Sequence, residues 1–265
     1  MNRINPWLAE CNSCAFLCSS LRAGSGTGID GLEILRRSNF QIVLDQIGKH
    51  TQLQDKRLLE VGSAKGWFLE AARERGVKAR GIEPELANAE LATDRGFDVE
   101  TGLFPDDLKD RGPYDIVIFN DVLEHIPEPH KAMLHVESML TPGGLAVVNL
   151  PSRRGALFRI ARLLSRFGVN GPYDRMWQKG FPSPHVSYFN PSNLKHMVES
   201  NTYLRQVGTT ALPSVTRNGL WSRIRSSESS ISAAPLFCGV WLLTFILNFL
   251  PNDIHVAIFK KENIA

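Results

Sequence analysis

Apolar residues recur along the chain in short blocks with two alternating spacings. The runs at 58–61 and 114–119 are nearly continuous, whereas the segments between them carry apolar residues three and four positions apart. Continuous runs of this length are typical of strands covered on both faces, and the wider spacing is typical of amphipathic helices. The alternation predicts an α/β fold with a doubly wound, mostly parallel sheet.

The predicted elements follow one another from residue 29 onward. Strands are expected at 58–61, 79–82, 97–101, 114–119, 145–150, 204–212 and 254–259, and helices at 29–49, 66–76, 86–95, 129–140 and 191–200. Glycine, proline and asparagine mark most of the boundaries. We expect a turn at 141–144, between a helix and the fifth strand.

The first candidate ligand-binding residues lie at 57–85. The first strand ends in the pattern Glu60-x-Gly62-x-x-x-Gly66, and the second strand ends on an acid, Glu83. Glycines let the backbone approach a ligand closely, and a helix N-terminus presents free N–H groups. An acid about 20 residues past the first glycine can accept hydrogen bonds from ribose hydroxyls. The stretch therefore predicts a site for an adenosine-containing ligand.

The spacing also bears on which nucleotide binds. A dinucleotide-binding loop reads G-x-G-x-x-G, whereas this turn has three residues between its glycines and an acid, Glu60, before them. A carboxylate there repels a pyrophosphate but pairs with an ammonium group. This favours a cationic ligand that carries an amino acid over NAD or FAD.

Three motifs in order resemble the class I S-adenosylmethionine-dependent methyltransferases. They are the E-x-G-x-x-x-G turn, the G-I-E-P sequence at 81–84, and N-D-V-L-E-H-I-P-E-P at 120–129, which is similar to the quinone-biosynthesis O-methyltransferases. The resemblance implies a Rossmann-like, seven-stranded sheet with its last strand antiparallel, and S-adenosyl-L-methionine as cofactor. One departure is Ala64, where many members have a third glycine. We expect alanine to be tolerated unless that position needs a positive φ.

The resemblance also implies a set of cofactor-binding residues. They are Glu60, Gly62, Ser63, Gly66, Glu83, Pro84, Leu103, Asn120 and Asp121. Glu60 and the glycine turn would hold the aminopropyl group, Glu83 the ribose, and Asn120 or Asp121 the methionine part. For Leu103, stacking on the adenine and simple core packing are both open.

Two histidines are candidate catalytic residues. His125 would lie where the methyl acceptor enters, and a neutral imidazole is suited to accept a proton near neutral pH. His185 borders the acceptor pocket in the resembled family and is the second candidate. Capping or backbone bonding by these histidines is the alternative. No metal is expected, because Glu124 and His125 lack an evident third ligand.

Size, charge and cysteines set the remaining bounds. The 265 residues carry a net charge of +3 and no dense basic tract, so no nucleic-acid partner is expected. We expect residues 1–28 to be an irregular extension and 29–265 to be a methyltransferase domain with insertions at about 152–190 and 220–251.

Cys11 and Cys14 have metal-ligand spacing, and Cys18 could be a third ligand. We expect ordinary thiols, with a metal site as the alternative.

Two segments raise the question of a membrane. Residues 152–168 carry five arginines and no acid, with Leu157, Ile160, Ala161 and Leu164 expected on one helix face. Such a helix either covers the substrate as a lid or lies on an anionic membrane. Residues 236–250 have no charge, and a helix in the interface or over an apolar pocket is favoured over a dimer contact or a span. With no signal peptide, we expect a cytoplasmic protein at the inner face of the membrane.

These patterns lead to one functional hypothesis and one alternative. We expect methyl transfer from S-adenosylmethionine, by O-methylation, to a small or lipid-linked acceptor. The alternative is a non-catalytic module that binds the cofactor or a partner at a membrane surface.

Overall fold

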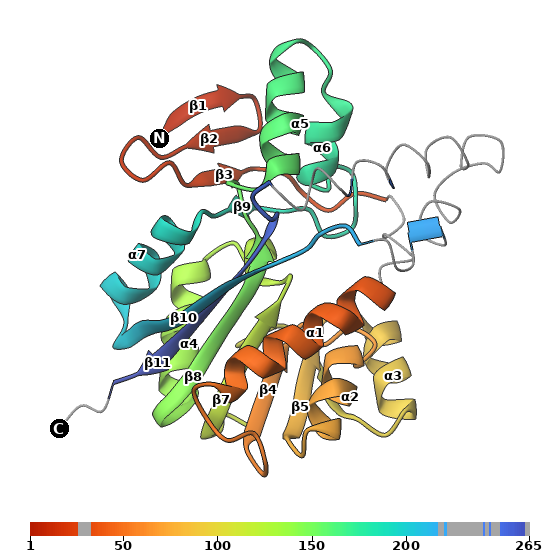
Figure 1. Ribbon diagram of the computed structural model, residues 1–265, viewed down its shortest axis with the longest axis vertical. Coiled ribbons are helices and arrows are strands. Elements are labelled where there is room, and N and C mark those ends of the chain that lie inside the picture. Colours follow the sequence, from red (N-terminus) through yellow and green to blue (C-terminus); the bar gives the residue numbers. More distant parts are fainter. Residues whose placement is uncertain (26–32, 217–219, 222–240, 242–243, 245–249, 263–265) are drawn as a thin grey trace. The chain divides into compact units, whose positions relative to one another are not determined.

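The computed structural model describes residues 1–25, 33–216, 220, 221, 241, 244 and 250–262. These residues divide into two compact units, each built from separate parts of the chain. The first unit comprises Met1–Asn39, Pro151–Asn190 and Ala211–Ile254, and the second comprises Phe40–Leu150, Pro191–Thr210 and His255–Ala265. The two units are described separately below (Figure 1).

The second unit holds a seven-stranded sheet. Its strands are β4 (Arg57–Val61), β5 (Lys78–Glu83), β6 (Asp98–Thr101), β7 (Tyr114–Asn120), β8 (Leu140–Pro151), β10 (Leu204–Leu212) and β11 (Ile254–Lys261), in the spatial order β10-β11-β8-β7-β4-β5-β6. The pairs that join β6, β5, β4, β7 and β8 are parallel, and one strand near the C-terminus is antiparallel. The predicted fold class is therefore confirmed.

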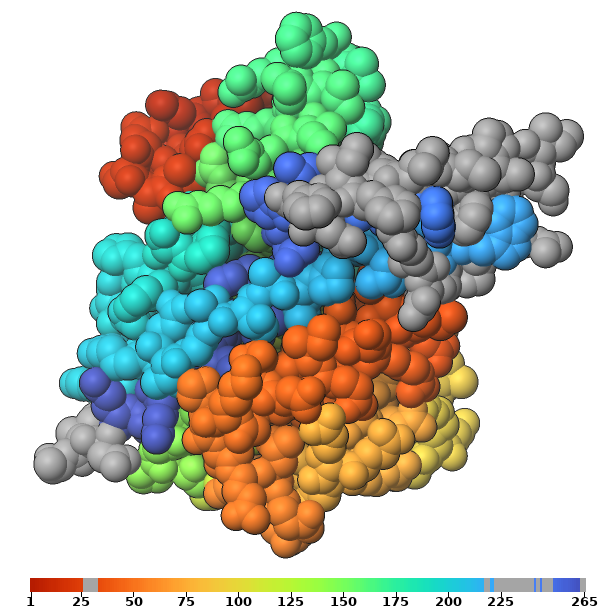
Figure 2. Space-filling view, viewed as in Figure 1, coloured from red at the N-terminus to blue at the C-terminus, as the bar shows by residue number. Residues whose placement is uncertain are grey.

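Helices surround this sheet and complete its core. They are α1 (Glu33–Gly48), α2 (Trp67–Glu74), α3 (Leu86–Asp94), α4 (Pro129–Met139) and α7 (Pro191–Asn201). Helix α2 packs on β5, α3 packs on β5 and β6, and α4 packs on α7 (Figure 1). Leu69 of α2, Ala92 of α3 and Phe97 form a buried cluster at one end of the sheet. Figure 2 shows α1 and β10 side by side on one face. Gly208 of β10 lies close to the His50 side chain.

The predicted turn at 141–144 is present in a different form. Strand β8 runs through these residues, but its pairing with β7 shifts there, from Tyr114 opposite Leu140 to Ile116 opposite Leu145. Gly143 takes a φ of 75° within this irregular stretch. The residues therefore form an irregularity inside a long strand rather than a separate turn, because neighbouring β7 continues past them.

The first unit corrects the expectation that residues 1–28 are irregular. Strands β1 (Asn2–Asn5), β2 (Leu8–Glu10) and β3 (Leu17–Ser19) join β9 (Ser187–Tyr188) in an antiparallel sheet of the order β1-β2-β3-β9. Helices α5 (Ala156–Arg166) and α6 (Gly171–Met176) accompany it in Figure 1. One buried cluster unites them: Leu8, Leu17, Phe158, Ala161, Tyr173, Trp177 and Tyr188. The N-terminal strands thus share a core with part of the predicted insertion at 152–190.

Helix α5 buries only part of the apolar face that the sequence predicts. Phe158 and Ala161 are buried, whereas Ile160 and Leu164, which were expected on the same face as Ala161, are 45% and 37% exposed. Phe167, just past the helix, is 79% exposed. The aromatic cluster of the small sheet selects the face with Phe158, because an aromatic ring buries more apolar area than an aliphatic side chain.

Several sequence-based predictions fall wholly or partly outside the described residues. These concern the start of the helix at 29–49 and nearly all of 236–250. Within the part of the chain that the structure describes, no helix has the length and apolar character needed to cross a bilayer.

Backbone strain appears at the alanine in the glycine turn. Ala64 takes a φ of 44°, which lies in the left-handed region that suits glycine. Alanine was expected to be tolerated here only if the position did not need a positive φ, so the position is strained. Its N–H is fixed there by a 2.8 Å hydrogen bond to the Glu83 carboxylate. The turn therefore keeps a conformation that alanine disfavours.

Relieving that strain should stabilise the protein. We expect Ala64→Gly to raise the free energy of unfolding by about 0.5–1 kcal/mol, because glycine enters the left-handed region without a Cβ clash. As a matched control, Ala87→Gly on the exposed first turn of α3 should lower it by up to about 1 kcal/mol. Urea denaturation monitored by circular dichroism measures both. A loss of stability in Ala64→Gly equal to that of the control would contradict the strain argument.

A buried histidine of the sheet should make stability depend on pH. Burial lowers the pKa of His255 to about 4, and its Nδ1 lies 3.5 Å from the Thr209 hydroxyl. An unfolded histidine titrates near 6.5, so between these values the unfolded chain binds more protons. Stability should therefore fall as the pH drops from about 6.5 toward 4, by roughly 3 kcal/mol in total from this residue.

The measurement compares urea midpoints at pH 7 and pH 5. His255→Gln should show a smaller drop between the two pH values than the parent protein. His130→Gln, on an exposed helix position, is the matched control and should keep the full drop. An unchanged drop in His255→Gln would show that this imidazole does not cause it.

Candidate active site

The turn between β4 and α2 is fastened to the neighbouring strand β5. The Gly62 N–H donates to the Ile82 carbonyl at 2.8 Å, and the Gly66 N–H donates to the Ser63 carbonyl at 2.9 Å. Both glycines take positive φ, 72° and 76°. A Cβ on Gly62 would come within 2.5 Å of the Val122 side chain, so this position needs glycine for space as well as for conformation.

Glu83 lies at the tip of β5, as predicted. It is buried, and its two carboxylate oxygens accept backbone N–H bonds from Ala64 at 2.8 Å and Glu85 at 3.0 Å. Burial raises the pKa of Glu83 above its ordinary value, and these hydrogen bonds act against that rise. Each carboxylate oxygen has a further lone pair, which leaves capacity for ligand hydroxyls. Pro84 follows on the exposed side.

Glu60 ends a chain of polar groups across three neighbouring strands. Its carboxylate is buried and accepts a 2.8 Å hydrogen bond from the Asn120 amide at the end of β7. The Asn120 oxygen in turn accepts a bond of 3.4 Å from Asn149 on β8. Asn149 is not among the residues predicted for the site. It is the one polar residue in the apolar strand LAVVNL, and it lies opposite Asn120 in the parallel register.

The two residues after Gly102 have different environments. Leu103 is 62% exposed, and its N–H is held by the Asp107 carboxylate at 2.8 Å. Phe104 instead packs edge-on against Phe119, with ring centroids 5.7 Å apart. The Gly102 N–H donates to the Glu83 carbonyl, which places this loop beside the acid. Phe104 therefore packs in the core, and the exposed Leu103 side chain is accessible to a ligand.

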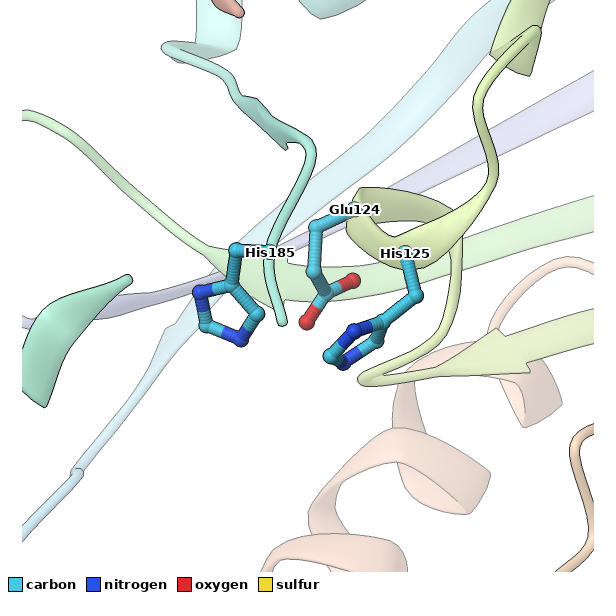
Figure 3. Close-up of side chains that lie close together, drawn as sticks. All are labelled: Glu124, His125 and His185. Carbon is cyan, nitrogen blue, oxygen red and sulfur yellow. The ribbon is translucent and has the colours of Figure 1, made fainter. Parts of the chain in front are cut away.

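The remaining predicted site residues of this unit follow β7 directly. Asp121 takes a positive φ of 54°, and its N–H donates to the Asn149 carbonyl at 2.8 Å. The short helix η1 (Leu123–His125) then presents Glu124, which is buried, and His125, which is half-buried (Figure 3). Polar groups just beyond the carboxyl ends of parallel strands face the ligand crevice in sheets of this type.

His185, also labelled in Figure 3, belongs to the first unit. It is buried, its N–H donates to the Trp177 carbonyl at 3.1 Å, and its carbonyl accepts from the Ser19 hydroxyl at 2.8 Å. Its Nε2 lies 3.0 Å from the Gln178 amide nitrogen. These contacts fix the ring among the aromatic residues that join the N-terminal strands to residues 151–190.

The N-terminal cysteines form no disulfide with another described residue. Cys11, Cys14 and Cys18 are each half-buried. Hydrogen bonds from the backbone of Cys14 and Ser13 lower the pKa of the Cys11 thiol, whereas burial raises the pKa of Cys18.

Comparison with known proteins agrees with this geometry. A family model described as a methyltransferase domain matches residues 32–202. Ubiquinone biosynthesis O-methyltransferase from Marinobacter nauticus is 29% identical over 138 residues, which cover 48% of this chain and 57% of the relative. The same enzyme from Burkholderia thailandensis is 24% identical over 168 residues, covering 60% and 69%. The chain thus spans little more than half to about two thirds of these relatives.

Solved structures share the fold. Phosphoethanolamine N-methyltransferase 2 from Haemonchus contortus, solved with S-adenosylhomocysteine, has a TM-score of 0.62 at 15% identity and covers 89% of this chain and 58% of its own. An S-adenosylmethionine-dependent methyltransferase from Archaeoglobus fulgidus has a TM-score of 0.53 at 18% identity and covers 87% and 97%. The expected family is confirmed, and with it S-adenosylmethionine as the cofactor. With a family match over more than half its length, the chain belongs to the methyltransferase-domain family.

Proposed function

We propose that this protein transfers a methyl group from S-adenosylmethionine to an oxygen atom of a small or lipid-linked acceptor. The observation that carries the proposal is the pairing of a buried carboxylate, Glu60, with the Asn120 amide beside a glycine turn. The curated relatives are O-methyltransferases, which supports oxygen as the accepting atom. No finding favours the alternative of a non-catalytic module.

On the donor side, each residue has a separate part. Glu60 faces an ammonium group, because a buried carboxylate is stabilised by a positive charge that is also buried. Glu83 accepts hydrogen bonds from ribose hydroxyls, and Leu103 covers the adenine. Asn120 and Asp121 hold the methionine part, and Ser63, Gly66 and Pro84 shape the turn around it. When bound, the cofactor supplies a methyl group on a sulfonium sulfur.

On the acceptor side, His125 accepts the proton of the acceptor hydroxyl as the new carbon–oxygen bond forms. A neutral imidazole can take that proton near neutral pH. Alignment of acceptor and methyl group contributes as well, since positioning alone removes a large part of the barrier to a two-reactant step. His185 remains a second candidate for binding or deprotonating the acceptor, and its fixed ring is suited to either part.

We also place the protein at the inner face of a membrane. The exposed apolar residues Ile160, Leu163 and Phe167 lie on or next to α5, among exposed Arg159 and Arg166. Apolar side chains between arginines are the pattern of helices that lie in an anionic lipid surface. Residues 236–250, which the structure describes only at 241, 244 and 250, would add apolar contact.

The donor site can be tested by removing one charge. We expect Glu60→Gln to weaken S-adenosylmethionine binding about 10–100-fold, because a hydrogen bond to a charged group contributes roughly 1.5–3 kcal/mol. Binding of adenosine, which lacks the ammonium group, should change little. Isothermal titration measures both ligands, and circular dichroism checks that the fold is kept. Equal weakening for the two ligands would contradict an ammonium-specific role.

The role of His125 as general base can be tested by substitution. We expect His125→Gln to lower kcat about 100-fold or more, in line with the usual contribution of a general base, while the Kd for S-adenosylmethionine stays the same. His130→Gln, five residues along the chain on the exposed side of α4, is the matched control. The assay follows radiolabelled methyl transfer into lipid and metabolite extracts from a deletion strain. A variant with normal kcat would remove His125 from the mechanism.

A further inference from the structure

Two neighbouring hollows of the first unit share two arginines of α5. The first has a volume of about 500 Å³ and includes Arg159, Ile160, Arg162, Leu163, Arg166 and Leu250 in its wall. The second, of about 450 Å³, includes Trp7, Arg162, Arg166, Tyr173, Asp174 and Lys179. Because Arg162 and Arg166 line both, one ligand could occupy the two hollows across these guanidinium groups.

The arginines differ in how their charge is balanced. Arg162 and Arg153 both pair with Glu10, at 3.1 and 2.8 Å, so one carboxylate serves two guanidinium groups. Burial raises the pKa of Glu10, but the hydrogen bonds and charges of these arginines outweigh burial and hold it below its ordinary value. Arg159 and Arg166 are exposed, and neither side chain forms a hydrogen bond or ion pair with another described residue.

The first hollow is apolar apart from these guanidinium groups. Ile160 and Leu163 on α5 are 45% and 52% exposed, and Leu250 is exposed beside them. Among the described residues, no acid lines this hollow. Covering such side chains with an alkyl chain would gain about 25 cal/mol for each Å² of apolar surface removed from water. Excess positive charge next to an apolar groove therefore suits an anion that carries a hydrocarbon chain.

The second hollow is more polar. Lys179 pairs with Asp174 at 3.0 Å and lies over the Trp7 ring, 5.5 Å from its centroid. Trp7 also packs on Tyr173 and Trp177, which fixes its ring. An aromatic face bordered by charged groups of both signs suits a polar head group that can stack and hydrogen-bond.

We propose that the two hollows form one binding site for a phosphate-bearing amphiphile. Its hydrocarbon chain lies along α5 in the first hollow, its phosphate lies between Arg159, Arg162 and Arg166, and its polar head occupies the second hollow beside Trp7. Arginine is suited to this part because its planar donors bind phosphate oxygens in pairs. The inference goes beyond the proposed function and is separate from it, because every residue that lines the two hollows belongs to the first unit.

Titration calorimetry on the full chain tests this site without any need for methyl transfer. The probes are dodecyl phosphate below its critical micelle concentration, inorganic phosphate, and dodecanol. Dodecyl phosphate should bind at least tenfold more tightly than either of the others, because only it engages both the arginines and the apolar wall. Equal affinity for inorganic phosphate and dodecyl phosphate would overturn the proposal.

Matched variants locate the binding. Arg166→Gln should weaken dodecyl phosphate about tenfold or more, as expected when one charge-assisted hydrogen bond is lost. Leu163→Ser should weaken dodecyl phosphate and leave inorganic phosphate unchanged. Arg175→Gln is the control, because Arg175 is exposed on nearby α6 and lies outside both hollows. Unchanged affinity in Arg166→Gln, with the fold intact by circular dichroism, would refute the site.

Two further experiments distinguish the amphiphile site from a bilayer surface and from the proposed methyl transfer. Binding only to phosphatidylglycerol vesicles, and not to monomeric dodecyl phosphate, would refute a single-molecule site in favour of a bilayer surface. Glu60→Gln should keep its affinity for dodecyl phosphate. If wild-type protein binds dodecyl phosphate but not S-adenosylmethionine, the proposed function fails and the amphiphile site stands. If wild-type protein binds S-adenosylmethionine but not dodecyl phosphate, the amphiphile site is refuted and the proposed methyl transfer stands.

Discussion

The hydrogen bond between the Glu83 carboxylate and the Ala64 N–H is the constraint on which the proposed donor site depends. It joins the tip of β5 to the turn that follows β4, so the acid and the glycine turn cannot move independently. The same bond keeps Ala64 at positive φ, where alanine is strained. Because strain of this kind persists only where the surroundings impose it, its location at the proposed site agrees with a functional role for the turn.

A second constraint comes from the polar groups at the ends of three parallel strands. Glu60, Asn120 and Asn149 lie on β4, β7 and β8 and form a chain of hydrogen bonds in a mostly buried setting. Polar groups in such a place are costly unless they are paired, so the strands must keep their register for the chain to form. The register of the sheet and the shape of the donor site are therefore set together.

The sequence predicted the sheet, the glycine turn and the place of Glu83 at the tip of a strand well, for local reasons. Continuous apolar runs and glycine boundaries identify strands and turns from neighbouring residues alone, and Glu60 and Glu83 stand at the ends of such runs. The small sheet of the first unit was missed because β3 pairs with β9, far along the chain, and strands of two to four residues leave no periodic signal. Asn149 was missed because its importance lies in its partner on β7.

The face that α5 buries could not be predicted for a related reason. Helical periodicity identifies an amphipathic helix, but the side that packs depends on what covers it, here the aromatic cluster around Phe158 and Trp177. That choice leaves Ile160 and Leu163 exposed among arginines. The exposed face of α5 therefore carries both positively charged and apolar side chains.

A co-crystal structure with S-adenosylhomocysteine tests the central claim most directly. We expect the amino group of the ligand to contact Glu60 and its ribose hydroxyls to contact Glu83. A ligand bound away from the β4–α2 turn, or bound there with the Glu60 carboxylate directed elsewhere, would contradict it.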